Sequence, residues 1–191
     1  MLDTSIESSK ILNDLIRSAS AAKIHYEVWW AQKYEVKPNL ATVMNEHSDF
    51  FRASADAHYT ALFVNLAHLY DKRPDSSCLL TFLNESANFI ESNRLVLLRE
   101  EYEVLANRAA PLITVRHKTV AHIDAKLSEQ AVFASLDTIW INQVREIVYD
   151  STIFVAKLAG TTDLGAIGIA RDQRFIECTL KLISALQKNS A

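Results

Sequence analysis

Glycine and proline are scarce in this chain, and their scarcity constrains the fold more than any other feature of the sequence. Each occurs only three times among 191 residues. Because these residues are the main breakers of helices and strands, long uninterrupted elements are expected. Between the breakers, apolar residues recur at spacings of three and four, the period of an amphipathic helix. The sequence therefore predicts an all-α protein, a helical bundle of about five to six helices.

The apolar stripes and the breakers between them place the expected helices. A capping box at Thr4 and Glu7 opens the first, and Asn39 is expected to cap the second. Pro111 is expected to kink the fourth helix or to restart it. No repeat or shift in composition divides the chain, so residues 1–191 are expected to form one domain. The expected helices span about 4–33, 40–70, 76–90, 95–122, 128–158 and 171–188, and the last is expected to bury Phe175, Cys178, Leu182 and Leu186.

Charge, cysteine content and hydropathy argue against several classes of protein. The net charge is −3, whereas a protein that coats nucleic acid with its whole surface is usually basic. Cys78 and Cys178 lack a zinc-binding spacing, so both are expected to be reduced thiols in the core. No apolar run is long enough to span a membrane, and the N-terminus lacks the order of a signal peptide. We therefore expect a cytoplasmic protein without membrane contact.

The end of the fourth predicted helix carries an unusual segment, RHKTVAH, at residues 116–122. Arg116 continues the apolar series of Ala109 and Leu112, so a guanidinium stands where the pattern predicts a buried hydrophobic side chain. Because a buried charge is costly without a partner, this position needs a reason. One reason is structural, since a basic last turn that contains histidine suits the negative end of the helix dipole. The other reason is a reaction site.

Arg116 and His122 together have the chemistry that metal-free cleavage of a phosphodiester requires. Arginine binds phosphate oxygens through two parallel hydrogen bonds, histidine exchanges a proton near neutral pH, and RNA supplies its 2′-hydroxyl as the nucleophile. His117 and His122 are five residues apart, a poor spacing for a shared metal, so no metal and no other cofactor is expected. On a regular helix Arg116 and His122 point about 120° apart. The site therefore needs a helix end, a bend or a second copy of the chain.

The histidines of the second predicted helix are not expected to form a metal site. His47, His58 and His68 share the second predicted helix, but no two of them have the i, i+3 or i, i+4 spacing of a metal-binding pair. Partly buried rings with single hydrogen bonds are expected for His58 and His68.

The remaining candidates for RNA contact are expected to have other roles. Arg99, Arg108 and Lys118 are cations near the motif, but glutamates lie close to them in the sequence, so a solvated surface role is expected. Trp29 and Trp30 are expected in the core or in a dimer contact rather than as platforms for base stacking.

The motif and its surroundings resemble the HEPN domains (higher eukaryotes and prokaryotes nucleotide-binding), in the abortive-infection branch of AbiU type. The family signature is an Arg, then Asn, Asp or His, then a few residues and a His, here Arg116, His117 and His122. The branch also shows a helix that ends in a segment similar to LARLFD, matched by LAHLYD at residues 66–71. The likeness covers roughly residues 20–150, and His117 stands where Asn or Asp is commoner.

The resemblance implies a metal-independent endoribonuclease that works as a homodimer, with both motifs facing a shared cleft. It implies that Arg116 holds the scissile phosphate and that His117 orients or polarises the site. His122 would act as general base on the 2′-hydroxyl or as general acid on the leaving 5′-oxygen. The implied role is that of a toxin or phage-defence protein, with RNA as substrate and an antitoxin or other partner protein. Since many family members are inactive scaffolds, the alternative is a non-catalytic HEPN-like dimer that binds a partner protein or a nucleotide.

Overall fold

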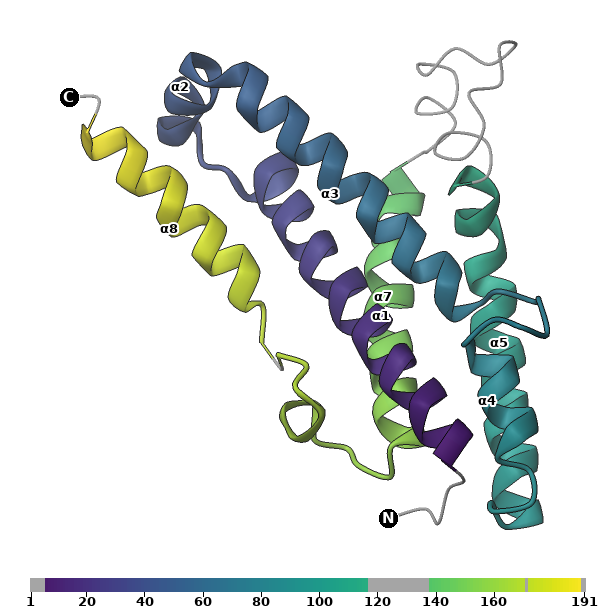
Figure 1. The fold of residues 1–191 in the computed structure, drawn as a ribbon. Coiled ribbons are helices and arrows are strands. Elements are labelled where there is room, and N and C mark those ends of the chain that lie inside the picture. The colour runs from purple at the N-terminus through teal and green to yellow at the C-terminus, as the bar shows by residue number, and fades with distance from the viewer. Residues whose placement is uncertain (1–5, 117–137, 171, 190–191) are drawn as a thin grey trace.

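The computed structural model describes residues 6–116, 138–170 and 172–189, and every regular element in these ranges is a helix (Figure 1). The all-α prediction is therefore confirmed. None of the helices in these ranges is long and apolar enough to cross a membrane. The elements are α1 (Ile6–Trp30), the π-helical turn η1 (Ala31–Glu35), α2 (Pro38–Glu46), α3 (Ser48–Leu69), α4 (Leu79–Glu85), α5 (Ser92–Arg116), α7 (Thr138–Leu158), the 3-10 turn η3 (Leu164–Ile167) and α8 (Arg174–Asn189).

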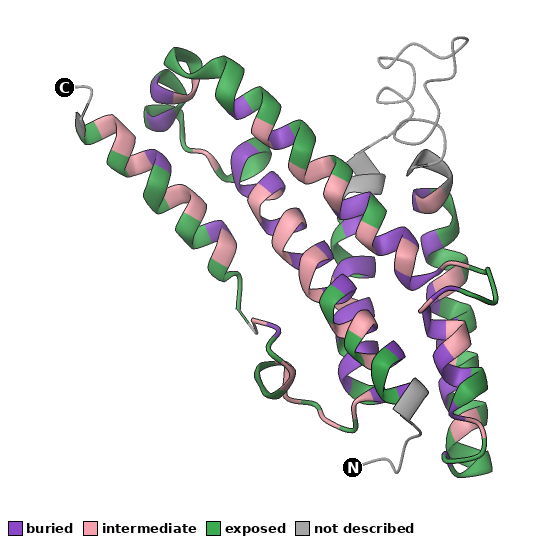
Figure 2. Cartoon of the chain, in the orientation of Figure 1, coloured by how far each residue is buried: buried purple, intermediate pink, exposed green. Residues whose placement is uncertain are grey.

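The first helix, α1, is the centre of the bundle. It packs most extensively against α3 and α7, and its later turns also contact α8. Its predicted stripe is buried, with Leu15 and Ala19 fully enclosed and Tyr26 only 1% exposed. In Figure 2 the buried positions lie on the sides of α1, α3 and α7 that face one another. The 3.6-residue period of the sequence thus identified the core-facing side of the central helix.

The second predicted helix is in fact two helices, because the chain turns at His47. This residue has φ −113° and ψ 33°, outside the helical region, and separates α2 from α3. The turn directs α2 toward α8, where Leu40 and Phe51 form a small separate core with Ile183. The predicted cap at Asn39 is also wrong. Lys37 is the cap residue and Pro38 occupies the first turn, where its missing N–H costs no hydrogen bond.

The last helix, α8, buries only part of the predicted face: Phe175 and Leu186 are partly buried, and Leu186 packs against the small core. Ile183 is fully enclosed and Ile176 is 8% exposed, whereas Leu182 is 58% exposed. Cys178 is exposed too, so only Cys78 is a core thiol. The apolar residues of α8 are spread over two adjoining faces, and only contact with α1, η1 and α2 selects the one that becomes buried.

A buried ion pair joins α8 to the bundle. Lys23 and Glu27, one turn apart on α1, are 1% and 0% exposed and bind each other. Glu27 also accepts hydrogen bonds from the Tyr149 hydroxyl of α7 at 3.0 Å and from the backbone N–H of Phe175 at 3.1 Å. Lys23 donates to the carbonyl of Asp172 at 2.8 Å. Both charges are therefore compensated inside the protein, which is the condition for burying them.

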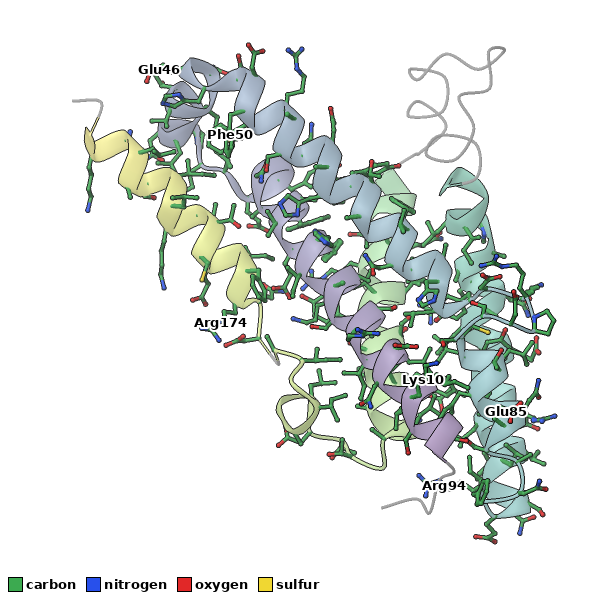
Figure 3. All side chains as sticks on the ribbon, in the orientation of Figure 1. Lys10, Glu46, Phe50, Glu85, Arg94 and Arg174 are labelled. Carbon is green, nitrogen blue, oxygen red and sulfur yellow. The ribbon has the colours of Figure 1, made fainter. Side chains whose placement is uncertain are left out.

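Replacing Glu27 by Ala should strongly destabilise the fold. The substitution leaves the Lys23 ammonium buried without its carboxylate and removes the acceptor for Tyr149 and for the first turn of α8. Breaking one partner of a buried pair typically costs about 3–5 kcal/mol. Urea unfolding followed by circular dichroism measures this loss. The matched control is Glu46→Ala, at an exposed carboxylate at the end of α2 (Figure 3), and equal losses for both variants would contradict the assigned role of Glu27.

Candidate functional site

The helix that carries the predicted motif, α5, is continuous from Ser92 to Arg116. It passes through Pro111 without the predicted restart, since Pro111 is exposed and its ring can project into solvent. The predicted stripe of α5 is buried: Ala109 is fully enclosed and Leu112 is 1% exposed. The last turns of α5 are thus fixed to the core, and they fix the backbone position at which the motif begins.

The three predicted catalytic residues lie at and beyond the end of α5. Arg116 is the last residue of the helix, and its backbone follows Ala109 and Leu112 in the core-facing register. Its side chain lies outside the described part of the structure, as do His117 and His122. Their assignment as site residues therefore stays a prediction.

A groove of about 1020 Å³ runs along α5 just before the motif. Its walls are the last turns of α3, the segment that follows them and the outer side of α5. Ile113 lines the groove and precedes Arg116 by three residues, about 4.5 Å along the helix axis. The polar and charged lining comes from Asn65, His68, Tyr70, Asp71, Lys72, Arg73, Tyr102, Glu103 and Asn107.

The LAHLYD segment at residues 66–71 holds this groove together. The Tyr70 hydroxyl lies 2.7 Å from the Ser151 hydroxyl of α7, and the Tyr70 ring stacks on Tyr102 of α5 at 6.4 Å. Burial raises the pKa of Tyr70 to about 12, so the phenol keeps its proton at neutral pH. One residue of the segment therefore ties the end of α3 to both α5 and α7.

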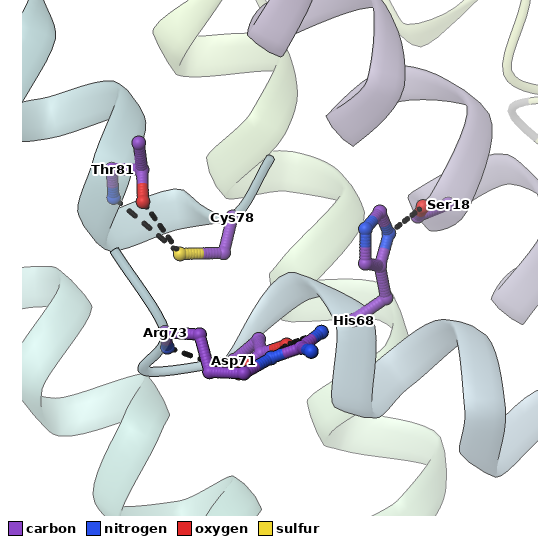
Figure 4. Close-up of polar contacts among 6 residues, drawn as sticks. All are labelled: Ser18, His68, Asp71, Arg73, Cys78 and Thr81. Atoms are coloured by element: carbon purple, nitrogen blue, oxygen red, sulfur yellow. Dashed lines mark hydrogen bonds and ion pairs between the residues drawn. The ribbon is translucent and has the colours of Figure 1, made fainter. Parts of the chain in front are cut away.

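Asp71 ends α3 by organising the turn that follows it (Figure 4). Its carboxylate accepts hydrogen bonds from Arg73, from the backbone N–H at 3.1 Å, Nε at 3.0 Å and Nη2 at 2.8 Å. The Arg73 side chain lowers the pKa of Asp71 to about 2. Asp71 is thus a permanently ionised structural residue, and a role in proton transfer at neutral pH does not fit it.

The histidines of α3 are partly buried and each has one hydrogen bond to another side chain, as predicted. His68 Nδ1 lies 2.7 Å from the Ser18 hydroxyl of α1 (Figure 4). His58 Nδ1 lies 2.8 Å from Nδ1 of His25, also on α1, and the two ring centroids are 5.0 Å apart. Because one nitrogen must donate and the other accept, this contact requires that the pair does not carry two charges.

The arginines near the motif are held by other side chains. Arg108 donates to Asp150 at 2.8 Å and to Glu146 at 3.1 Å, which joins α5 to α7. Arg99 donates to Asn84 at 3.0 Å. The expected surface role of both is consistent with these contacts, while Lys118 lies outside the described residues.

Sequence reasoning missed two sets of polar residues, the Lys23–Glu27 pair and the His25–His58 pair. The i, i+4 spacing of Lys23 and Glu27 was visible as a helical ion pair. Its burial was not visible, because the covering residues come from α7 and from the start of α8. Among the described residues, no group of three or more His, Cys, Asp and Glu side chains is placed to hold a metal ion.

The His25–His58 pair should make stability depend on pH. Burial lowers the pKa of both rings below the usual 6.5, and repulsion from His58 lowers that of His25 further. The unfolded chain therefore takes up protons first, so stability is full above about pH 6.5 and declines as the pH falls below it. Urea unfolding between pH 7.5 and 5.0 should show a shallower decline for a His25→Leu, His58→Leu double variant. His47→Leu, at an exposed histidine, is the control, and an unchanged slope in the double variant would exclude the pair as the source.

In a comparison with known families, residues 8–150 match the HEPN_AbiU2 family model, which is described as AbiU2. The matched range contains the LAHLYD segment and the whole of RHKTVAH. No curated protein and no solved structure matches the chain. The match ends before α8, so the single domain expected over residues 1–191 stays a prediction.

Proposed function

We propose, since this chain belongs to the AbiU2 family of HEPN domains, that it is a metal-independent endoribonuclease whose reaction is carried by Arg116, His117 and His122. The observation that carries the proposal is the family match, because it spans the complete Arg-His-x4-His motif. The continuous α5, with one face packed on the core, supports it, since a rigid helix can hold a reacting group at a defined position.

The proposed reaction is transesterification within the RNA chain. A neutral imidazole takes the proton of the 2′-hydroxyl, the 2′-oxygen forms a bond to phosphorus, and the bond from phosphorus to the 5′-oxygen breaks. A protonated imidazole gives its proton to the leaving 5′-oxygen. The products are a 2′,3′-cyclic phosphate and a 5′-hydroxyl. The Arg116 guanidinium stabilises the negative charge that builds up on the phosphate oxygens.

A homodimer would supply both protonation states of histidine. The His122 residues of two protomers at a shared cleft would divide the roles of base and acid, and the usual histidine pKa near 6.5 populates both forms around neutral pH. His117 would orient the phosphate or polarise it. The biological role that fits is a toxin or phage-defence protein that cuts RNA in the cytoplasm and is restrained by an antitoxin.

The purified protein should cleave RNA in the presence of EDTA, and His122→Ala should lower the rate about 10²–10⁴-fold, the usual contribution of a general acid or base. Arg116→Ala should lower it by a similar factor because the charge on the phosphate is no longer stabilised. A labelled RNA resolved on a gel measures the rate, and the cut ends should carry a 2′,3′-cyclic phosphate.

The matched controls are His47→Ala, at the turn between α2 and α3, and Arg94→Ala, at the first turn of α5 and far from its motif end (Figure 3). Both residues are exposed, and both variants should cleave as the parent does. Equal rates of RNA cleavage by His122→Ala and the parent, or no cleavage by either, would contradict the proposal.

Expression of the protein should slow the growth of a bacterial host, and His122→Ala should restore growth at equal protein level. The physical reason is that cleavage of host RNA slows growth, whereas the mere presence of the folded protein does not. Growth curves with quantified expression measure it. A growth defect of equal size in the two strains would show that toxicity does not depend on the motif.

The exposed side of α5 favours the alternative, a non-catalytic protein that binds a partner. Val96, Leu97 and Val104 are 54%, 64% and 59% exposed, on the side of α5 that faces away from the core. Exposed apolar side chains on one helix face are typical of a contact surface. A parent protein that forms dimers or partner complexes but leaves RNA intact would establish this alternative.

A further inference from the structure

Trp30 and Tyr34 form a partly exposed aromatic surface where α1 ends. Their ring centroids are 4.6 Å apart, and Trp29 packs its ring against the edge of Tyr34 at 5.6 Å. Tyr34 is 47% exposed and Trp30 is half-buried. The indole N–H of Trp30 donates to Glu35 at 2.7 Å, so its polar atom is already bound. Because Tyr34 covers the Trp30 ring, the ring that is exposed for a ligand to stack on is that of Tyr34.

The π-helical turn η1 creates this arrangement. It widens the helix over Ala31–Glu35, directly after Trp30, and places Tyr34 on the Trp30 ring. Such π-helical turns are rare in proteins, and those that occur are often found at functional sites. Tyr26 supports Trp30 from the core side at 5.7 Å, so the surface is backed by packed aromatic residues.

A groove that contains lysines adjoins the aromatic surface. It lies between η1 and α2 on one side and α8 on the other, with a volume of about 590 Å³. Glu35 links the two features, because it binds Trp30 and also lines the groove. The charged lining consists of Lys37, Lys181 and Lys188 with Glu35 and Glu177, so three positive and two negative charges leave +1, in a chain whose net charge is −3.

Two lysines of this groove, Lys37 and Lys188, are available to a ligand. Lys181 lies 3.7 Å from Glu177, but Lys37 and Lys188 form no ion pair with any described residue. All three lysines are exposed. Exposed ammonium groups along a groove are the usual contacts of a nucleic-acid backbone.

We infer that this aromatic surface and the adjoining groove bind single-stranded RNA, with a base stacked on Tyr34 and phosphates along Lys37, Lys181 and Lys188. The inference rests on the proposed function for the choice of RNA. Stacking on aromatic rings together with a cationic groove is the common way to hold single strands, and it requires unpaired bases. Sites of this kind bind a strand with little sequence preference, because every base has a π face.

The helix α8 owes its place in this groove to the buried ion pair. Glu27 and Lys23 hold its first turn, and Gln187 donates to the carbonyl of Asn39 at 2.7 Å near its other end. This helix lies outside the residues that match the HEPN family, so the groove is an addition to the matched domain. Figure 1 shows α8 and α5 on opposite sides of α1, so this surface holds RNA away from the motif end of α5.

Fluorescence anisotropy of a labelled 20-nucleotide single-stranded RNA tests the inference. The full chain with His122→Ala serves as the parent, so that binding is measured without cleavage. Tyr34→Ala should weaken binding about tenfold, because base stacking on one aromatic side chain contributes about 1–3 kcal/mol. Lys37→Glu and Lys188→Glu should each weaken RNA binding about fivefold. Each should also make the slope of log K against log salt concentration less steep by about 0.7, the value for one phosphate contact.

Matched controls are Phe89→Ala, at an aromatic residue of similar exposure (44%), and Lys10→Glu, on the early part of α1 (Figure 3). Both should bind RNA as the parent does. Circular dichroism melts confirm that each variant is folded, and Trp30→Phe, which keeps a ring in place, should weaken binding less than Tyr34→Ala.

Four results would overturn the inference. The first two are equal RNA binding by the groove variants and the parent, and binding of an RNA duplex as tight as that of the single strand. The other two are a preference for single-stranded DNA of the same sequence, and no RNA binding by the parent, in which case a protein partner would remain for this surface. If the unsubstituted protein binds single-stranded RNA but does not cleave it, the proposed function alone is contradicted. If the unsubstituted protein cleaves RNA, and the Tyr34→Ala and Lys188→Glu variants bind RNA as tightly as the parent, this inference alone is contradicted.

Discussion

The buried contact between Lys23 and Glu27 is the constraint on which the arrangement of this molecule depends. Two charges inside a protein are tolerated only when each finds fixed partners, and here the partners come from three separate parts of the chain. Glu27 accepts from α7 and from the start of α8, and Lys23 donates to the segment just before α8. The pair therefore sets where α8 crosses the bundle. The second core around Leu40, Phe51 and Ile183, and the groove that faces η1, both follow from that crossing.

The other end of the bundle is organised by the LAHLYD segment. Tyr70 joins α3 to α5 and α7, Asp71 binds Arg73 and stops the helix, and His68 reaches back to Ser18 of α1. This segment is one of the two by which the sequence resembles its family, and its contacts are structural. It holds α5 against the core, and α5 ends at Arg116. Under the proposed function, one segment of the resemblance therefore positions the site and the other carries the chemistry.

The chain belongs to the AbiU2 family and folds into helices over its described residues, and the ribonuclease reaction that we propose uses the motif at the end of α5. The two proposals of RNA binding and RNA cleavage concern different parts of the protein. The motif follows α5, and the aromatic surface lies where α1 meets η1 and α8. A protein with a negative net charge can still bind RNA at a groove lined by several lysines, because the Debye length of about 8 Å limits each phosphate to nearby charges.

The sequence by itself determined the helical class, the core-facing sides of α1 and α5, and the motif at residues 116–122. These depend on local periodicity and residue chemistry, which are readable along one helix. It misplaced part of the buried face of α8 and joined α2 to α3 across His47. Only the tertiary structure decided these points. The face that α8 buries and the charges of α1 that are neutralised depend on neighbours more than a hundred residues away, as with Glu27 and Phe175. Spacing along one segment does not encode those neighbours.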